Sequence, residues 1–228
     1  ESVRRQSYPD VEHIVVDGAS KDETLKIVQD FDHVACCLSA PDRGLYDAMN
    51  KGLALANGEV IGILNSDDFY CHNKVLANVA KQLQASGTDA LYADLNYVHP
   101  LNLEQTVRHW RSGAYNRQKF RYGWMPPHPT FFVRREHYEN LGGYDLDFRS
   151  AADYELMLRF LYKYQLSACY LPEVTVHMRT GGLSNSSLQQ RWRANREDRR
   201  AWAKNDLQPA LYTMWLKPLR KIPQFFQR

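Results

Sequence analysis

The segment Asn65-Ser-Asp-Asp68 carries the strongest chemical signal in this sequence, because two consecutive carboxylates follow the apolar run 60–64. Adjacent carboxylates repel each other, and a divalent cation or the hydroxyl groups of a ligand would relieve that cost. Oxygen ligands suit magnesium or manganese, which also bridge diphosphates. The same residues could instead cap a helix on a solvated turn, and taken alone they favour neither interpretation.

Asp17-Gly-Ala-Ser20 is a second acidic cluster and also follows an apolar run. Gly18 allows another group to approach the backbone closely, and Asp17 could accept hydrogen bonds from a nucleobase imide or a ribose. Helix capping is the more common role for such residues, and Ser20 with Glu23 has the pattern of a capping box. The absence of GxGxxG and GxxxxGK[ST] motifs disfavours a dinucleotide fold and a P-loop.

Alternating strands and helices must position these clusters. The predicted strands of the first half are 13–17, 34–38, 60–64 and 90–93, and helices are predicted to start at Ser20, near 45 and near 73. The run 60–64 is apolar throughout, which is typical of a parallel strand covered on both faces. This order predicts an open α/β sheet, in which ligands bind beyond the carboxyl ends of the strands. Both acidic clusters fall at such ends.

The second half is more mixed. Segment 105–135 has seven basic side chains, no acidic ones and several aromatic ones, and it suits an acceptor groove slightly better than a nucleic-acid patch or a solvated loop. A strand is predicted near 130–133, a helix over 153–162 and a short strand over 174–178. The pattern of residues 186–228 predicts mostly helical structure.

Four motifs in this order resemble glycosyltransferase family 2, in the branch that makes bacterial surface polysaccharides. They are Asp17-Gly-Ala-Ser-Lys-Asp-Glu-Thr24, Asp42-Arg-Gly44 with Asp47-Ala-Met-Asn-Lys-Gly52, Asn65-Ser-Asp-Asp68, and Gly142-Gly-Tyr-Asp145 with Ala152-Asp153. The resemblance covers about residues 1–185. It implies an inverting transferase of the GT-A fold: an open mixed α/β sheet flanked by helices with a Rossmann-like nucleotide-binding half, here followed by a helical appendage over 186–228.

The resemblance also implies roles for individual residues, with a nucleotide-sugar as donor and uridine as the expected base. Donor binding would fall to Asp17, Ser20, Arg43, Asp47 and Asp67, and Asp68 would ligate Mn²⁺ or Mg²⁺ on the diphosphate. Asp153 would be the general base. The family often has Asp where this chain has Asn65, so the metal-ligand set departs from the family pattern. The family often has Glu-Asp where this chain has Ala152-Asp153, which keeps Asp153 as the base but removes a neighbouring carboxylate.

Two histidines and two aromatic residues complete the candidates. His177 precedes a glycine turn in a segment that resembles one completing the metal site in this family, and a structural histidine is an equal alternative. His128, Trp124 and Tyr122 are candidates for the acceptor-side wall, beside a glycan or lipid-linked glycan. For His128, a rigid loop position is the alternative.

Charge is unevenly distributed. Residues 189–228 hold ten basic and three acidic side chains, whereas residues 1–188 hold 19 and 23, which disfavours a uniformly basic nucleic-acid binder. The tail mixes aromatic and basic residues, so it could lie on an anionic membrane surface or pack on the body or in a homodimer. Four cysteines without a CxxC pattern suit a reducing cytoplasm, which with the tail predicts a cytoplasmic, peripherally membrane-associated protein.

Two other functions stay open: a noncatalytic nucleotide- or sugar-binding module of the same fold, and a nucleotidyltransferase. Both Asp68 and Asp153 are present, which argues against the first, and no glycine- and arginine-rich activating loop is visible for the second. In the resembling fold a central strand precedes the segment that ends near Gln6, so we expect the natural chain to extend further upstream.

Overall fold

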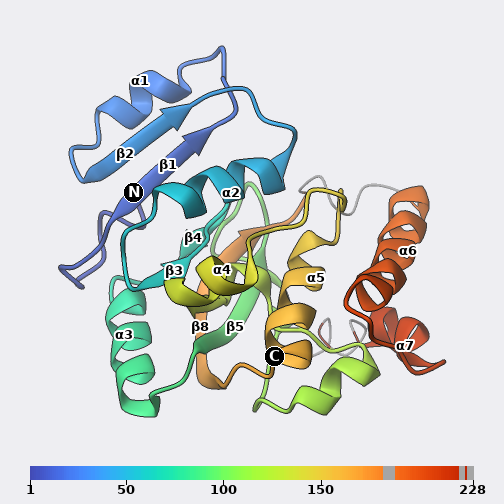
Figure 1. Cartoon of the computed structure of the whole chain (residues 1–228). Coiled ribbons are helices and arrows are strands. Elements are labelled where there is room, and N and C mark those ends of the chain that lie inside the picture. The colour runs from blue at the N-terminus through green and yellow to red at the C-terminus, as the bar shows by residue number, and fades with distance from the viewer. Residues whose placement is uncertain (182–187, 221–223, 225–228) are drawn as a thin grey trace.

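The computed structural model describes residues 1–181, 188–220 and 224, and its first half alternates strands and helices as predicted (Figure 1). Its elements are β1 (His13–Asp17), α1 (Thr24–Gln29), β2 (Val34–Ser39), α2 (Leu45–Leu55), β3 (Val60–Gly62), β4 (Phe69–Tyr70) and α3 (Val75–Ser86). The fold class predicted from the sequence, an α/β sheet flanked by helices, is confirmed.

The second half contains longer strands than the sequence pattern predicts. Its elements are β5 (Ala90–Val98), β6 (Thr106–Trp110), the 3-10 turns η1 (Arg117–Tyr122) and η2 (His128–Thr130), β7 (Phe132–Arg134), α4 (Arg135–Leu141), α5 (Ala152–Met157), the π-helical turn η3 (Leu158–Lys163), β8 (Ala168–Arg179), α6 (Leu188–Lys204) and α7 (Thr213–Leu219). β5 and β8 extend well beyond the expected 90–93 and 174–178, and β6 was not predicted.

The strands form two sheets. β1 and β2 pair in parallel, and the second sheet has the order β3-β7-β5-β8-β4, with β6 paired to β5. The parallel pair β5 and β8 runs through its centre. The prediction that 60–64 is a parallel strand is wrong: β3 pairs antiparallel with β7, and its apolar residues pack against that neighbour. Within the described residues, β1 pairs only with β2 and β3 only with β7.

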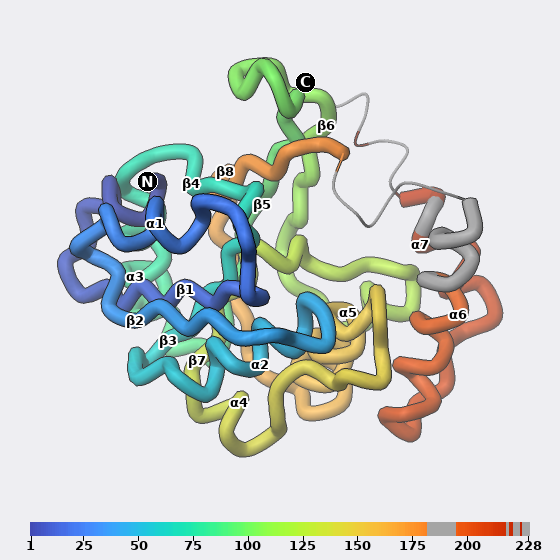
Figure 2. The backbone as a smooth tube through the Cα atoms, turned by 90° about the horizontal axis from the view of Figure 1, so that it is seen from above, coloured from blue at the N-terminus to red at the C-terminus, as the bar shows by residue number. Residues whose placement is uncertain are grey.

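Helices cover the larger sheet on both faces (Figures 1 and 2). On one face, α3 buries Val75, Val79 and Leu83 against β5, β7 and β8. On the other, α5 and η3 are almost completely buried and share a core with aromatic residues from segment 120–148. A helix that is buried on nearly all sides in this way belongs inside a protein, and its charged residues Glu155 and Arg159 are paired with each other.

The expected capping box at Ser20 and Glu23 is wrong. α1 begins only at Thr24, and no side chain of Glu23 caps it. Instead the Asp22 carboxylate accepts hydrogen bonds from the Thr24 N–H at 3.0 Å and from its hydroxyl at 2.5 Å. Ser20 therefore lies in the loop that follows β1, where its N–H donates a hydrogen bond to Asp17.

The tail packs onto the body as far as the structure describes it. Trp202 of α6 is fully buried, and its Nε1–H donates to the Tyr154 hydroxyl at 2.8 Å. α7 lies against η1, beside α6 (Figure 1). Phe225 and Phe226, which contributed to the predicted amphipathic tail, lie outside the described residues. Among the helices described, none has both the length and the apolar composition needed to cross a bilayer.

Candidate active site

The loop after β1 fixes the Asp17 carboxylate. Asp17 is buried, and its Oδ2 accepts hydrogen bonds from the Ser20 N–H at 3.0 Å and the Ser39 hydroxyl at 2.6 Å. Hydrogen bonds from Ser20 and Ser39 hold the pKa of Asp17 below its ordinary value. The turn places Ala19 at a φ of 62°, a conformation that few residues other than glycine adopt. Asp17 is therefore a charged, preset acceptor at the end of its strand.

A second loop lies directly against the first. A Cβ at Gly18 would lie 2.6 Å from the Asp42 carboxylate, so the two loops approach each other closely and the Asp42 side chain would have to move to make room for a side chain there. Asp47, in the first turn of α2, accepts a hydrogen bond from the Arg43 N–H at 3.1 Å and forms an ion pair with Lys51 at 3.4 Å. Asp47 thus holds the Arg43 loop in shape, while the Arg43 side chain extends into solvent.

The Asn65–Asp68 turn contains oxygen atoms that have no hydrogen-bond donor among the residues that the structure describes. Asn65 Nδ2 donates to Asp68 Oδ2 at 2.9 Å, whereas Asn65 Oδ1 and Asp68 Oδ1 are buried without a hydrogen-bond partner. Burial, reinforced by the neighbouring charge of Asp67, raises the pKa of Asp68 to about 6. Unpartnered buried oxygens are costly, and a hard divalent cation is a ligand that would satisfy them. These oxygens therefore fit the metal that the sequence predicts.

His177 lies one strand away from this turn. It pairs with Phe69 across β8 and β4, and the two rings meet edge to face at 5.4 Å. In the part of the chain that the structure describes, no three His, Cys, Asp or Glu side chains converge on one possible metal position. The structure consequently does not bring His177 together with Asp67 and Asp68 as a complete ligand set.

Asp153 is held by a tyrosine from the opposite side of the site. It is the second residue of α5, and the Tyr46 hydroxyl of α2 donates to its Oδ1 at 3.2 Å. Burial, with the Asp153 charge adding to it, raises the pKa of Tyr46 well above its ordinary value, so the hydroxyl remains a donor. Asp153 Oδ2 has no hydrogen-bond partner among the described residues, and one oxygen is left for a ligand.

Two further rings line the wall beside Asp153. Tyr144 stacks on Tyr46 at 5.7 Å, and its hydroxyl is hydrogen-bonded to His128 Nε2 at 2.6 Å. Burial lowers the pKa of His128, which keeps the imidazole neutral, although the Asp153 charge acts in the opposite direction. His128 thus lies near Asp153 but inside the wall, behind Tyr144.

Tyr97 of β5 connects the two acidic positions electrostatically. Burial raises its pKa, and the charges of both Asp68 and Asp153 add to that effect while Arg108 opposes it. The two carboxylates therefore lie within electrostatic range of one hydroxyl, although 85 positions separate them in the sequence. The fold has brought the predicted metal ligand and the predicted base into one region.

The start of α5 is fixed by a buried ion pair and by α6. Arg159 Nε donates to Glu155 Oε1 at 2.9 Å, and its Nη2 donates to the Gly143 carbonyl at 2.6 Å. From α6, the Glu197 carboxylate accepts hydrogen bonds from the Ser150 N–H and hydroxyl, both at 2.8 Å. The segment that carries Asp153 is therefore held at both ends.

Two of the predicted acceptor-side residues are placed elsewhere. Trp124 is only 4% exposed, and its Nε1–H donates to the Ser112 carbonyl at 3.0 Å, so it is a core residue and its predicted place on the acceptor wall is wrong. The aromatic segment 120–124 folds inward because Phe120 and Trp124 pack against Tyr154 and Tyr92. Tyr122 is exposed, but its ring stacks on Tyr212 of the tail at 5.4 Å.

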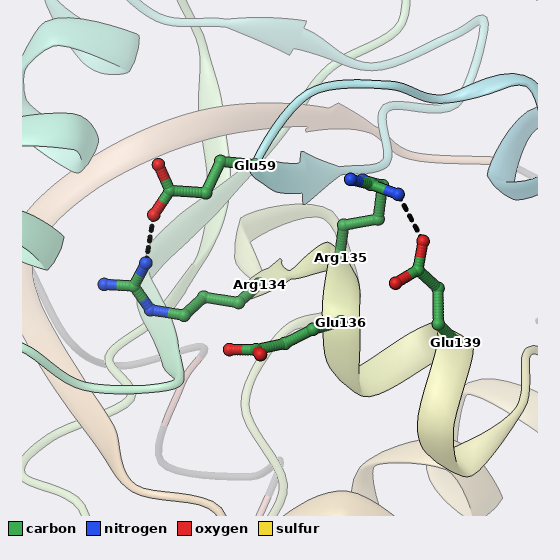
Figure 3. Close-up of a pocket in the computed structure, with 5 residues that line it drawn as sticks. All are labelled: Glu59, Arg134, Arg135, Glu136 and Glu139. Carbon is green, nitrogen blue, oxygen red and sulfur yellow. Dashed lines mark hydrogen bonds and ion pairs between the residues drawn. The ribbon is translucent and has the colours of Figure 1, made fainter.

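A surface groove lies at the other end of β3. It encloses about 300 Å³ and is lined by Glu59, Arg134, Arg135, Glu136 and Glu139 (Figure 3). Arg134 pairs with Glu59 and Arg135 with Glu139. This groove shares no residue with the acidic positions and has paired arginines, so we do not assign the donor to it.

The sequence pattern did not single out Tyr46, Tyr97 or Tyr144 as site residues. Tyr46 follows the glycine turn at Gly44, and Tyr144 lies in the Gly142-Gly-Tyr-Asp145 motif, so their positions within the motifs were the available signal. Tyr97 lies in an apolar strand and carries no local signal of function.

The chain is similar in sequence to known glycosyltransferases. The sequence profile of glycosyl transferase family 2 matches residues 1–142. An uncharacterised glycosyltransferase of Mycobacterium tuberculosis is 35% identical over 161 residues, which are 69% of this chain and 60% of that protein. A PGL/p-HBAD biosynthesis glycosyltransferase of Mycobacterium bovis is 31% identical over 192 residues, covering 82% and 72%. The chain thus spans about 60% of the length of the first of these relatives.

Solved structures share the fold. TarS 1–349 of S. aureus, in complex with UDP-GlcNAc, superposes with a TM-score of 0.70 at 18% identity, covering 95% of this chain and 64% of that one. The mannosyltransferase PcManGT of Pyrobaculum calidifontis, in complex with GDP-Man and Mn²⁺, has a TM-score of 0.65 at 21% identity, covering 95% and 66%. The family profile spans most of the chain and the M. bovis relative most of both proteins, and together with the fold they show that the chain belongs to glycosyl transferase family 2.

Proposed function

We propose that this chain is an inverting, metal-dependent glycosyltransferase. It transfers a sugar from a nucleoside diphosphate sugar, with uridine as the expected base, to a hydroxyl of a glycan or lipid-linked glycan in surface polysaccharide synthesis. The observation that carries the proposal is the presence of two acidic positions in one region: Asp68, whose Oδ1 is buried without a hydrogen-bond partner among the described residues, and Asp153, held by Tyr46 with one oxygen available. The nucleotide-sugars bound by TarS and PcManGT support the choice of donor class.

In this proposal each acidic position has a separate task. Asp17 accepts hydrogen bonds from the base, Ser20 and the Asp47-supported Arg43 loop bind the donor, and Asp67 binds the ribose or the sugar. Asp68 ligates the cation, with His177 as a candidate second ligand, and the bound diphosphate supplies further oxygens. The cation, when bound, neutralises the charge that develops on the leaving diphosphate.

Asp153 acts on the acceptor. Its Oδ2 takes the proton of the acceptor hydroxyl while the acceptor oxygen bonds to the anomeric carbon. The bond from that carbon to the diphosphate oxygen breaks with its electron pair, and the nucleoside diphosphate leaves. A single displacement of this kind inverts the configuration. Tyr46 keeps Oδ1 occupied, which orients the carboxylate, and the His128–Tyr144 pair stiffens the wall behind it.

A donor screen tests the proposal. We expect calorimetry to show manganese-dependent binding of one class among UDP-, GDP- and dTDP-sugars, and we expect Asp17→Asn to weaken it. Binding without any turnover would favour the noncatalytic module, and pyrophosphate release from a nucleoside triphosphate would favour the nucleotidyltransferase.

The role of Asp153 is tested separately. Asp153→Asn is expected to lower turnover by about a hundredfold or more while donor affinity is kept, because general-base catalysis contributes about 10²–10⁴-fold. The exposed Asp10→Asn serves as the matched control and is expected to change neither quantity. Near-normal turnover of Asp153→Asn would remove this residue as the base.

A further inference from the structure

Helix α7 exposes an unusual amount of apolar surface. Leu211 is 95% exposed and Trp215 is 72% exposed, and Tyr212 and Leu219 are also exposed. Trp215 and Leu219 are four residues apart within α7 and therefore lie on one face of it, and Leu211 lies in the turn just before the helix. Tyr122 of η1 extends this stripe, because its exposed ring stacks on Tyr212. We call these five residues the α7 stripe.

The opposite side of α7 is firmly attached to the body, so the stripe is not a loose end. Met214 and Thr213 are buried, and the Thr213 hydroxyl donates to the Arg121 carbonyl at 2.5 Å. A side chain at Gly123 would meet the backbone of Lys217 at 2.6 Å, which shows how closely the helix approaches η1. Lys217 also forms an ion pair with Asp198 of α6 at 2.7 Å. The fold therefore presents the stripe on a rigid support.

Positive charge borders the stripe. Arg121 and Arg220 are exposed, and in the described part of the chain neither has a carboxylate within ion-pair distance. Burial lowers the pKa of Lys119, and the nearby charge of Arg220 lowers it further. Cations from η1 and from the end of α7 therefore lie near each other. The charge of Arg121 acts to lower the pKa of the Tyr212 hydroxyl, so Arg121 also lies near the stripe. An apolar stripe with an aromatic residue and a cationic border has the composition of a surface that binds an anionic lipid interface.

We propose that the α7 stripe and its border of Arg121 and Arg220 form a docking surface for an anionic lipid bilayer. The apolar side chains enter the acyl boundary and the cations meet the phosphate groups. The charge border favours this occupant over a second copy of the chain, because two like-charged borders would face each other in a symmetric dimer. The surface contains none of the residues proposed for donor binding or catalysis, and Tyr122, which the sequence placed on the acceptor-side wall, belongs to this surface instead.

Co-sedimentation with vesicles tests the proposal on the full chain. We expect binding to phosphatidylcholine vesicles that contain about one-third phosphatidylglycerol, weaker binding to pure phosphatidylcholine, and loss of binding at high salt. Replacing Leu211, Trp215 and Leu219 together with Ser should weaken vesicle binding about tenfold or more, given the apolar area removed. Arg121→Gln and Arg220→Gln should each weaken it about fivefold.

Matched controls come from the same chain. Leu101→Ser removes an equally exposed leucine, at 91%, far from α7 in the sequence, and Lys81→Gln removes an exposed cation of α3. Both are expected to bind vesicles normally. Thermal unfolding confirms that each variant is folded, and donor binding by calorimetry, which needs no lipid, shows whether the proposed function stands independently.

Three results would overturn the proposal. They are no preference for anionic vesicles, equal losses in the stripe variant and in Leu101→Ser, and a dimer in light scattering that the stripe variant converts to monomer. The last result would identify a second copy of the chain as the occupant.

Discussion

The Tyr46 hydroxyl donates a hydrogen bond to Asp153 Oδ1 at 3.2 Å, joining two residues that lie 107 positions apart. Tyr46 comes from the first turn of α2 and Asp153 from the first turn of α5, so the contact ties the helix that follows the Arg43 loop to the helix that carries the proposed base. A carboxylate with one oxygen held in this way loses rotational freedom. This hydrogen bond therefore joins the proposed donor side of the site to its proposed acceptor side.

Removing this hydroxyl should affect turnover and not donor binding. Tyr46→Phe keeps the ring stack with Tyr144 but removes the hydrogen bond, and we expect kcat to fall about tenfold to a hundredfold, the effect of about 1–3 kcal/mol. Steady-state kinetics and donor calorimetry measure the two quantities. Tyr164→Phe, at an exposed tyrosine, is the control. An unchanged kcat for Tyr46→Phe would show that the contact does not orient the base.

Manganese binding should depend on pH through Asp68. The pKa of this carboxyl is raised to about 6, so its proton competes with the cation at lower pH. We expect manganese affinity to fall by up to about tenfold per pH unit below about 6, and Asp68→Asn to abolish most of the dependence. Calorimetric titration across this range checks it. His177→Ala in the same titration decides whether that residue is a ligand, since unchanged affinity would exclude it.

The same substitution should stabilise the metal-free protein. Because the pKa of Asp68 is higher in the folded state than its ordinary 3.8, the unfolded state loses its proton first and stability falls as pH rises through this interval. Asp68→Asn should therefore raise the free energy of unfolding above pH 6 by up to about 3 kcal/mol. Denaturant unfolding with a chelator measures it. A less stable variant at neutral pH would show that burial of the charged Asp68 carboxylate does not destabilise the folded protein.

Asn50 should prove to be a structural member of the predicted motif. Its Nδ2 donates to the Tyr144 carbonyl, and its Oδ1 accepts from the Tyr144 N–H, both at 2.7 Å. Asn50→Ala leaves both backbone groups unpaired, and we expect a loss of about 1–3 kcal/mol in the free energy of unfolding. Turnover should fall as well, since Tyr144 supports the wall beside Asp153. Asn73→Ala, at an exposed asparagine, should leave both quantities unchanged.

Acid sensitivity should arise partly at the far end of β1. His13 Nδ1 and His33 Nε2 lie 3.0 Å apart, and burial, with the His33 charge adding to it, lowers the pKa of His13 to about 4. The unfolded chain takes up this proton near pH 6.5 and the folded chain only near 4, so stability falls as pH drops through that interval. His13→Gln should reduce this loss by about 1–2 kcal/mol, as measured by unfolding at neutral and acidic pH. An equal acid loss in the variant would assign the sensitivity elsewhere.

Much of the fold could be predicted because its signals are local. The runs before Asp17 and Asn65 are apolar and short, and the helix after Gly44 has the expected spacing, so the order of elements in the first half follows from the chain. The predicted capping box at Ser20 does not form, because the carboxylate of Asp22, two residues later, accepts the hydrogen bond of the Thr24 N–H. The predicted direction of β3 was also wrong. A run of apolar residues is compatible with parallel or antiparallel pairing, and the tertiary fold decides which strand it pairs with.

The sequence by itself determined which residues are able to bind a ligand or act as a base. They are the acidic residues at the strand ends, Asp153 in the second half of the chain, and the basic and aromatic residues of the tail. Only the tertiary structure decided which of them meet. It placed Trp124 in the core and Tyr46 beside Asp153. It also buried Asn65 Oδ1 and Asp68 Oδ1 where no described residue hydrogen-bonds to them. It also divided the aromatic residues of the tail, burying Trp202 and exposing Trp215. The physical reason is that residue type and spacing act within one element, whereas burial and hydrogen-bond partners depend on elements that are distant in the chain.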